Sequence, residues 1–413
     1  MKRSLNVFLK QDLVGDLEQD KDGALHFRYA EGWLNSKPAI PLSTSLPLQK
    51  ERFGRKLCRP FFAGLLPELT NRELIAKAFG VSDKNDFAIL EKIGAECAGA
   101  VSLFAPSETP PDEDSSYREI TLDELEKKFT ELPAHPLLTG TQGIRLSLAG
   151  AQGKLVVAIR NEKFSLPLGG APSTHILKPP SAHYEQLVEN EFFCVRLAKR
   201  VGLEVADVEM GKAGDTSFLQ VKRFDREEMA DGHLERIHQE DFCQAIGIPP
   251  ELKYQQEGGP NLKRCFALVR SVSSVPGPDV LKLFDAVVFN FLIGNNDAHG
   301  KNFSFLYTVD CARFAPLYDL VSTRAYPRLS ENMAMKIGDA AAPTKIETRD
   351  WRKFFADAGL GQAQAVQRLL NFTKRVRDEA LLMSDERVNG SQLLPPVVVA
   401  RCDTLLSRDW EKK

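Results

Sequence analysis

The chain lacks a strong excess of charge, a long apolar run and closely spaced cysteines, and each absence argues against a class of protein. With 54 basic and 56 acidic residues among 413, the formal net charge is −2, so the surface as a whole is not built to coat nucleic acid. The longest apolar run, residues 286–293, is interrupted by Asn290 and is far shorter than the roughly 20 residues that span a bilayer. The first ten residues also lack the apolar core of a secretion signal. We therefore expect a cytoplasmic protein with no membrane association.

The cysteines and histidines are scattered as well. No two of the seven cysteines form a C-x-x-C pair, and no two of the seven histidines form an H-x-x-x-H pair. Both spacings are common in structural zinc sites, so the sequence argues against such a site. We interpret the cysteines as small buried apolar residues in a reducing compartment.

Length and composition predict a globular protein of two or three domains, because 43% of the residues are apolar and 27% are charged. The segment 106–116 is proline-rich and acidic without an apolar anchor, which is typical of a solvated linker. After it, Thr121 and Glu124 form a capping-box pattern that predicts a helix to about residue 132. We divide the chain into an N-terminal subdomain, a linker, a β-rich part and a helical part, with bounds 1–105, 106–117, 118–238 and 239–413.

Hydrophobic periodicity gives the elements of these parts. In the first part, residues 4–30 read as short strands with a turn at 20–23, and two helices follow at 71–79 and 86–93. The β-rich part contains an amphipathic helix over 184–201 and strands over 144–148, 155–159, 174–178 and 217–224. The helical part contains an apolar, and therefore buried, helix over 278–294 and two short strands over 303–307 and 312–317. This order predicts a two-lobed α+β fold.

The most informative segment is Gly294-Asn-Asn-Asp-Ala-His-Gly-Lys-Asn302. It places Asp297 five residues before Asn302, and Asp319 follows after the two short strand-like runs. This order is typical of a kinase phosphotransfer site, in which one carboxylate faces the attacking hydroxyl while an amide oxygen and a second carboxylate hold Mg²⁺. We therefore predict Asp297 as the catalytic carboxylate, with Asn302 and Asp319 as magnesium ligands.

Two further features suit the phosphates of a nucleotide. The small residues of the turn 149–154 let main-chain N–H groups approach an anion. The turn is not a Walker A loop, because Leu148 stands where its first glycine would be and Leu155 replaces Ser or Thr. Lys178 ends the next strand, where an ammonium can bridge phosphates and pair with a helix carboxylate. The candidate partner is Glu191, with Glu189 as the second choice.

These features, together with several other segments, resemble the HipA-type serine/threonine kinases, the toxins of bacterial HipBA toxin–antitoxin modules. The resemblance extends over almost the whole chain. The matching segments are Ser45-Leu-Pro-Leu-Gln49, Leu65-Leu-Pro-Glu68, Ile93 to Val101, Ser147 to Lys154, Thr174 to Lys178, Asn190-Glu191, Arg223-Phe-Asp-Arg226, Gln239 to Gln244, Gly294 to Phe303 and Tyr318-Asp319.

The resemblance implies a two-lobed protein-kinase-like α+β fold, with a β-rich N-terminal lobe that carries an extra N-terminal subdomain and an all-α C-terminal lobe. It implies ATP and Mg²⁺ as cofactors, with the loop 149–154 over the phosphates and 222–224 as the hinge beside adenine. The residues expected to bind ATP are Ala149, Gly150, Ala151, Gln152, Gly153, Lys154, Lys178, Lys222, Arg223, Phe224, His299, Asn302, Tyr318 and Asp319.

The resemblance also implies regulation and partners. Ser147 would be an autophosphorylation site that, once modified, ejects the phosphate loop and inactivates the kinase. The partners would be a small helix-turn-helix antitoxin similar to HipB, in a heterotetramer or larger assembly, and operator DNA, contacted mainly through the antitoxin. The protein substrate would be an aminoacyl-tRNA synthetase, glutamyl-tRNA synthetase in the best-known case.

Two residues depart from the family pattern, and two other functions stay open. Gly153 stands where family members often have Glu, and Lys222 replaces an acidic hinge residue, which leaves adenine recognition there to main-chain groups. A small-molecule phosphotransferase of aminoglycoside-kinase type shares the order of Asp297, Asn302 and Asp319 but gives Ser147 no role. An inactive pseudokinase that serves as a corepressor is the alternative that is not an enzyme.

Overall fold

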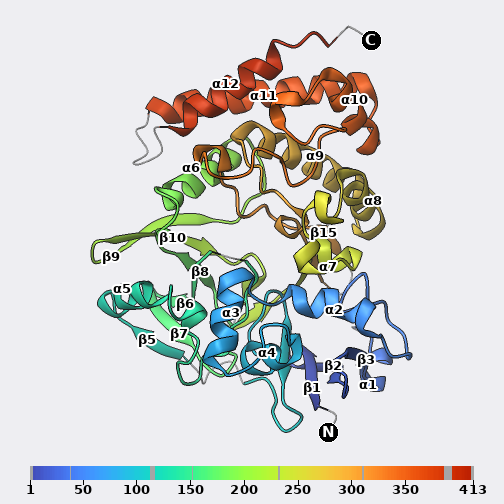
Figure 1. Ribbon diagram of the computed structural model, residues 1–413, viewed down its shortest axis with the longest axis vertical. Helices are drawn as coiled ribbons and strands as arrows, with labels where there is room; N and C mark the ends of the chain where they lie inside the picture. The colour runs from blue at the N-terminus through green and yellow to red at the C-terminus, as the bar shows by residue number, and fades with distance from the viewer. Residues whose placement is uncertain are drawn as a thin grey trace. The chain divides into compact units, whose positions relative to one another are not determined.

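The computed structural model describes residues 3–37, 39–111, 117–150, 152–230, 233–308, 311–385 and 393–410. The chain divides into two compact units (Figure 1). Unit 1 comprises residues 1–179, 209–250 and 306–311, and unit 2 comprises residues 180–208, 251–305 and 312–413. The finer division of the chain at 105, 117 and 238 stays a prediction.

The first sheet of unit 1 is antiparallel, with the order β3-β2-β1-β4. Its strands are β1 (Arg3–Leu9), β2 (Asp12–Gln19), β3 (Leu25–Tyr29) and β4 (Val101–Phe104). The helices between β3 and β4 in the chain are α1 (Glu31–Leu34), α2 (Arg55–Gly64), α3 (Leu69–Ala78) and α4 (Asp86–Ile93). The predicted turn at 20–23 forms because the Asp20 carboxylate accepts hydrogen bonds from the backbone N–H groups of Asp22 and Ala24.

The second sheet of unit 1 has the order β5-β7-β6-β8-β10-β9. Its strands are β5 (Tyr117–Ile120), β6 (Leu155–Arg160), β7 (Lys163–Pro167), β8 (His175–Lys178), β9 (Val208–Ala213) and β10 (Thr216–Lys222). Helix α5 (Leu122–Glu131) begins with the predicted capping box, in which Thr121 and Glu124 each accept a hydrogen bond from the other's backbone N–H. The shorter elements of unit 1 are β11 (Arg226–Glu228), β12 (Leu234–Arg236), β13 (His238–Asp241) and α7 (Phe242–Ile246).

The prediction of a strand over 144–148 is wrong. Only Leu146 makes a β-bridge there, with Glu96. The segment is held by single contacts instead, because Ser147 N–H donates to Glu96 O at 2.8 Å and Arg145 O accepts from Glu96 N–H at 3.0 Å. The segment therefore contacts the backbone of Glu96 through these two hydrogen bonds and is not a strand of either sheet.

Unit 2 is mainly helical. Its helices are α6 (Leu187–Arg200), α8 (Leu262–Val272), α9 (Pro276–Ile293), α10 (Thr348–Asp357), α11 (Gln362–Asp385) and α12 (Leu394–Leu406). Two strands, β14 (Ser304–Tyr307) and β15 (Ala312–Phe314), follow α9, and residues 306–307 of β14 belong to unit 1. Short 3-10 helices across the chain are η1 (Pro136–Leu138), η2 (Pro250–Leu252), η3 (Gln255–Glu257), η4 (Gly300–Asn302), η5 (Thr323–Ala325) and η6 (Pro343–Lys345).

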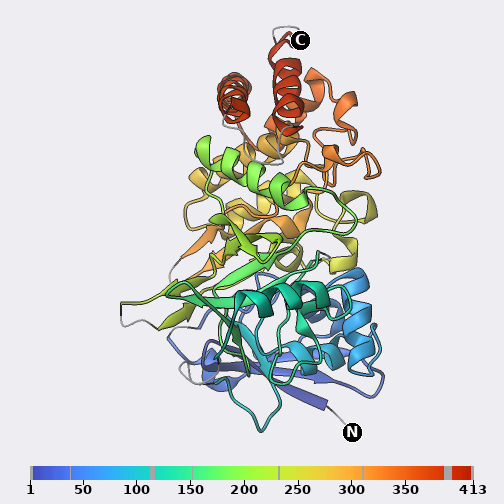
Figure 2. The same cartoon turned by 90° about the vertical axis from the view of Figure 1, so that its left-hand side faces the viewer.

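Helix α9 is the buried helix that the sequence predicts. Nearly all of its residues from Val280 to Ile293 are buried, and Phe284 stacks on Phe354 of α10 with ring centroids 4.9 Å apart. The two helices nearest the C-terminus, α11 and α12, lie side by side in both views (Figures 1 and 2). Among the described residues, no helix has the length and apolarity to cross a membrane.

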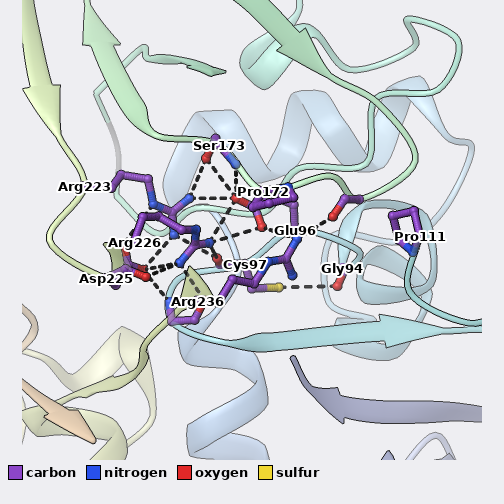
Figure 3. A network of polar contacts seen from close by, with 12 residues as sticks. Gly94, Glu96, Cys97, Pro111, Pro172, Ser173, Arg223, Asp225, Arg226 and Arg236 are labelled. Atoms are coloured by element: carbon purple, nitrogen blue, oxygen red, sulfur yellow. Dashed lines mark hydrogen bonds and ion pairs between the residues drawn. The ribbon is translucent and has the colours of Figure 1, made fainter. Parts of the chain in front are cut away.

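A buried ion network joins distant segments of unit 1 (Figure 3). The Glu96 carboxylate lies 3.0 Å from the guanidinium groups of Arg223, Arg226 and Arg236. Asp225 pairs with Arg223 at 2.7 Å and with Arg226 at 3.1 Å. The side chains in these pairs are at most 9% exposed. The network fixes the chain that follows β10, which explains why β10 ends at Lys222 and not at the predicted residue 224.

Electrostatics decides the protonation state of this network. Burial by itself raises the pKa of Glu96, but Arg226, Arg236 and Arg223 outweigh burial and lower this pKa to about 2. In the same way, Arg223 and Arg226 hold the pKa of Asp225 well below its ordinary range despite burial. Both carboxylates are therefore ionised at neutral pH, against three guanidinium groups.

Removing one carboxylate leaves buried cationic charge without compensation. We predict that Glu96→Gln lowers the free energy of unfolding by about 3–5 kcal/mol at pH 7, measured by urea denaturation. Because the pKa of Glu96 is lowered in the folded state, its stabilisation is complete above the pKa of the unfolded chain and is lost as pH falls toward about 2. The difference between the two proteins should therefore stay constant from about pH 8 to 6 and shrink below about pH 5.

The control is Glu119→Gln, which breaks a surface ion pair with Lys163 in which both side chains are at least 60% exposed. We expect a change below about 1 kcal/mol for this variant. A Glu96→Gln protein as stable as the control would contradict the structural role given to the network.

Candidate active site

The segment that carries Asp297 begins where helix α9 ends. Gly294 closes the helix in the left-handed conformation, with φ of +74°, and its N–H donates to Phe291 O. A Cβ atom at this position would lie 2.9 Å from the Cβ of Arg324. Glycine is therefore required both for the backbone turn and for the close approach of the chain near residue 324.

Asp297 lies on an exposed turn, and hydrogen bonds hold both its backbone and its carboxylate. Its N–H donates to Asn295 Oδ1 at 3.1 Å, and its C=O accepts from His299 N–H at 2.7 Å. Its carboxylate Oδ1 accepts from the hydroxyl of Tyr254 at 2.8 Å. The carboxylate is solvent-accessible, as a group that meets a substrate hydroxyl must be.

Asn302 ends the short 3-10 helix η4, and its N–H donates to His299 O at 3.0 Å. Its amide Oδ1 is buried and has no hydrogen-bond partner among the described residues. A buried amide oxygen without a hydrogen-bond partner lowers the stability of the fold by about 1–3 kcal/mol. Amide oxygens are also ligands that Mg²⁺ accepts. Asn302 therefore fits the role of a Mg²⁺ ligand.

Asp319 is exposed, and its backbone adopts the left-handed conformation with φ of +53°. This conformation is uncommon outside glycine, although Asp tolerates it better than most residues. Asp319 O accepts a long hydrogen bond, 3.5 Å, from Asn295 Nδ2. Strained backbone of this kind is concentrated at functional sites, where surrounding contacts enforce it.

Two side chains bring the three predicted residues into one hydrogen-bonded neighbourhood. Asn295 contacts the backbone of both Asp297 and Asp319. The hydroxyl of Tyr318, which precedes Asp319, donates to the C=O of Lys301, which precedes Asn302, at 2.7 Å. These contacts place the backbone of the three predicted residues in one neighbourhood of unit 2, and the convergence of their side chains stays a prediction.

The segment after Asp319 is held from helix α6. Asn190 Nδ2 donates to Ser322 O at 3.0 Å, and its Oδ1 accepts from Ser322 N–H at 2.8 Å. Asn190 and Ser322 are both buried. One amide side chain thus satisfies both backbone groups of a residue three positions after Asp319.

The predicted phosphate loop lies in unit 1, and Ala151 lies outside the described residues. Lys154 Nζ donates to Ala149 O, which closes the loop on itself. Gly150 has φ of +109°, a conformation that requires glycine. A Cβ atom at Gly153 would meet nothing within 4 Å, so the glycine found in place of the family's Glu is not a steric requirement.

Ser147, next to this loop, is fully buried. Its hydroxyl donates to Leu65 O at 2.8 Å, which fixes the serine to the end of the α2 segment. In this conformation the hydroxyl is not accessible to a phosphate donor.

Lys178 and Lys222 belong to the same antiparallel ladder. Lys178 of β8 pairs with Leu219 of β10, and Lys222 pairs with His175. The two paired positions are three residues apart, so by strand alternation the two lysine side chains leave opposite faces of the sheet. Lys178 is buried and Lys222 is exposed. The expectation that residue 222 contributes main-chain groups to adenine recognition stays a prediction.

The remaining predicted residues divide between the two units. The Arg223 side chain belongs to the buried ion network, and its N–H donates to Thr174 O at 2.9 Å, so its role at the hinge stays a prediction. Phe224 is half-buried beside it. His299 is buried in unit 2, with its ring edge-on to Tyr254 at a centroid distance of 5.4 Å. Glu191 is buried on α6 in unit 2, while Lys178 lies in unit 1, and their pairing stays a prediction.

Sequence reasoning missed the residues that hold the site together. Tyr254, Asn190 and Asn295 contact the backbone or carboxylates of the predicted residues. Of these, Asn295 could have been found from its position two residues before Asp297, because Asn side chains commonly bind the backbone two residues ahead. The other two give no local signal.

A two-lobed α+β kinase is the class that this fold and site define, and comparison with known proteins agrees. Residues 5–104 match the HipA N-terminal domain family, and residues 146–380 match the HipA-like C-terminal domain family. A putative kinase of Sinorhizobium fredii, Y4mE, is 48% identical over 89% of each chain. The serine/threonine-protein kinase toxin HipA of Shewanella oneidensis is 30% identical over 98% of this chain and 96% of its own.

The solved structures include the complex of Shewanella oneidensis HipA and HipB with operator DNA. Its HipA-like chain superposes with a TM-score of 0.84 at 28% identity, covering 98% of this chain and all of that one. The chain belongs to the HipA family, and it is a kinase. The prediction of a two-lobed kinase-like α+β fold is confirmed.

The contact between Asn190 and Ser322 can be tested by stability. We predict that Asn190→Ala lowers the free energy of unfolding by about 1–3 kcal/mol, because the buried N–H and C=O of Ser322 lose their partners. The matched control is Asn371→Ala on helix α11, where the side chain is exposed and the change should stay within about 0.5 kcal/mol. Equal stability of the two variants in urea denaturation would show that the contact contributes nothing.

Proposed function

We propose that this kinase uses ATP and Mg²⁺ to phosphorylate serine or threonine hydroxyl groups of proteins. The observation that supports this most is the buried Oδ1 of Asn302, which lacks a partner among the described residues and lies in the same neighbourhood as Asp297 and Asp319. An amide oxygen and a carboxylate that converge in this way suit a hard divalent cation.

The residues of unit 2 divide the work of phosphoryl transfer. Asn302 and Asp319 would hold Mg²⁺, which supplies the positive charge that neutralises the phosphate oxygens. Asp297 would orient the attacking hydroxyl and accept its proton. Because the carboxylate of Asp297 is exposed and fixed by Tyr254, it is available to a hydroxyl that arrives from solvent.

The residues of unit 1 would hold the nucleotide. The buried Lys178 would contact the phosphates, and the loop 149–154 would cover them with main-chain N–H groups. Main-chain groups of 222–224 would meet adenine, in a conformation set by the Arg223 ion pairs. The buried Gln152 Nε2, which has no partner among the described residues, is a further donor in this loop.

We further propose that the kinase is the toxin of a toxin–antitoxin pair. One relative is named a HipA kinase toxin, and the similar solved structure holds HipA with HipB and operator DNA. The corresponding partner here would be a small helix-turn-helix antitoxin, with operator DNA bound mainly through it. The family resemblance makes an aminoacyl-tRNA synthetase the proposed protein substrate.

Autophosphorylation of Ser147 is the proposed means of inactivation. A phosphate adds about 1.5 to 2 negative charges at pH 7, which cannot remain in the fully buried environment of this residue without a partner. Phosphorylation therefore requires Ser147 to leave Leu65, and the modified segment cannot return. The adjacent phosphate loop would be displaced with it.

Mass spectrometry after incubation with Mg-ATP tests the proposed activity. We predict a gain of one phosphate on Ser147 in the wild-type protein. Asp297→Asn should slow this reaction by about 10²–10⁴-fold, because the variant cannot accept the proton of the hydroxyl. Calorimetric titration with Mg-ATP should show that the variant still binds nucleotide.

Two other results of these experiments would each favour one of the alternative functions. An unmodified wild-type protein that phosphorylates an aminoglycoside would favour a small-molecule phosphotransferase. A wild-type protein that binds no Mg-ATP would leave the pseudokinase corepressor. Either result contradicts the proposed function.

A further inference from the structure

Tyr254 contacts the predicted catalytic carboxylate directly. Its hydroxyl donates a hydrogen bond to Asp297 Oδ1 at 2.8 Å. Its ring lies edge-on to His299, two residues further along the same loop, at a centroid distance of 5.4 Å and an interplanar angle of 78°. Tyr254 is half-buried. Tyr254 therefore contacts the loop 294–302 at two residues, through a hydrogen bond to Asp297 and a ring contact with His299.

The backbone beside Tyr254 is fixed to the catalytic loop through a third segment. Gln255 N–H donates to Ala334 O at 3.0 Å, and Gln255 Oε1 accepts from Lys336 N–H at 2.8 Å. Ala334 N–H in turn donates to Asn296 O at 2.7 Å. Asn296 immediately precedes Asp297. Ala334 is therefore hydrogen-bonded both to the residue after Tyr254 and to the residue before Asp297.

The loop that presents Tyr254 has a tightly defined shape. The backbone C=O of Tyr254 accepts hydrogen bonds from Glu257 N–H at 3.0 Å and from Gly259 N–H at 2.9 Å. Gly258 has φ of +99°, and a Cβ atom at Gly259 would lie 2.4 Å from Leu252 O and 2.7 Å from Tyr254 O. Glycine is therefore required at these two positions, and the two hydrogen bonds to Tyr254 O hold the loop that presents the phenol.

The hydrogen bond has a direct consequence for geometry. A carboxylate on an exposed turn can rotate about χ1 and χ2, and each rotation moves its oxygens relative to an attacking hydroxyl. The Tyr254 hydroxyl, which is bonded to Asp297 Oδ1, restricts these rotations before a substrate arrives. The chain next to Tyr254 is itself held by hydrogen bonds to residues 334 and 336. Small misplacements of a catalytic group cost large factors in rate.

We propose that Tyr254 is a positioning residue for phosphoryl transfer: its hydroxyl fixes the carboxylate of Asp297 in the orientation that receives the substrate hydroxyl. The proposal rests on the proposed kinase function of Asp297. Tyr254 acts through Asp297 and contacts neither nucleotide nor metal in this role. Its removal should therefore change the rate of the chemical step and leave nucleotide binding unchanged.

The test is Tyr254→Phe in the full-length protein, which removes one hydroxyl and keeps the ring beside His299. The phosphorylation rate of Ser147 is followed by mass spectrometry over a range of Mg-ATP concentrations. We expect the limiting rate to fall about 10- to 100-fold, while the Mg-ATP concentration that gives half of this rate changes less than about twofold. Melting temperature and calorimetric Mg-ATP affinity should match the wild type.

The matched control is Tyr117→Phe in unit 1. Tyr117 is also half-buried, and its hydroxyl donates to Pro172 O at 2.8 Å, so this variant loses a comparable hydrogen bond away from Asp297. Its limiting rate should equal that of the wild type.

The outcomes separate this proposal from the proposed function. If the wild-type protein transfers phosphate and Tyr254→Phe keeps its limiting rate, the role of Tyr254 is overturned and the kinase function stands. A loss confined to nucleotide affinity would equally overturn it. If the wild-type protein transfers no phosphate, the proposed function fails and the role of Tyr254 fails with it.

Discussion

The hydrogen bonds of Asn295 are the constraint on which the catalytic geometry depends. Its Oδ1 accepts from Asp297 N–H, and its Nδ2 donates to Asn290 Oδ1 at 2.7 Å and more weakly to Asp319 O. One buried amide therefore joins the end of helix α9 to the two carboxylate-bearing turns. An amide suits this task because it supplies both a donor and an acceptor and carries no charge. Asn295 binds the backbone of both turns, so these hydrogen bonds do not occupy the carboxylates of Asp297 and Asp319.

The two units use different means to hold their functional segments. In unit 1, the segment after β10 is fixed by ion pairs of two carboxylates and three guanidinium groups at positions 96, 225, 223, 226 and 236. In unit 2, the neutral side-chain amides of residues 190, 295 and 296 hold the loops. Buried ion pairs are strong only when every member is paired, which suits a segment that receives no charged ligand. Neutral amides suit a site that must attract Mg²⁺ and phosphate without competing fixed charges.

The sequence alone predicted the local parts of this arrangement and missed the long-range parts. Asp297 and Asn302 could be proposed as site residues because they lie in one short segment after a buried helix, and most strands and helices followed from periodicity. The roles of Tyr254 and Asn190 were not predicted, because they contact partners 43 and 132 residues away. The strand predicted over 144–148 was wrong for the same reason, since its partner at Glu96 lies far away in the chain. Alternation of apolar residues cannot show which distant backbone groups a segment will meet.

The central claim is that Asn302 and Asp319 hold one magnesium ion for a kinase reaction. A crystal structure with Mg²⁺ and a non-hydrolysable ATP analogue tests it most directly. We predict one metal ion with Asn302 Oδ1 and an Asp319 carboxylate oxygen as ligands, at about 2.1 Å each, and with phosphate oxygens completing its coordination. A metal ion bound to the nucleotide but held by other side chains, with Asn302 Oδ1 still without a partner, would contradict it.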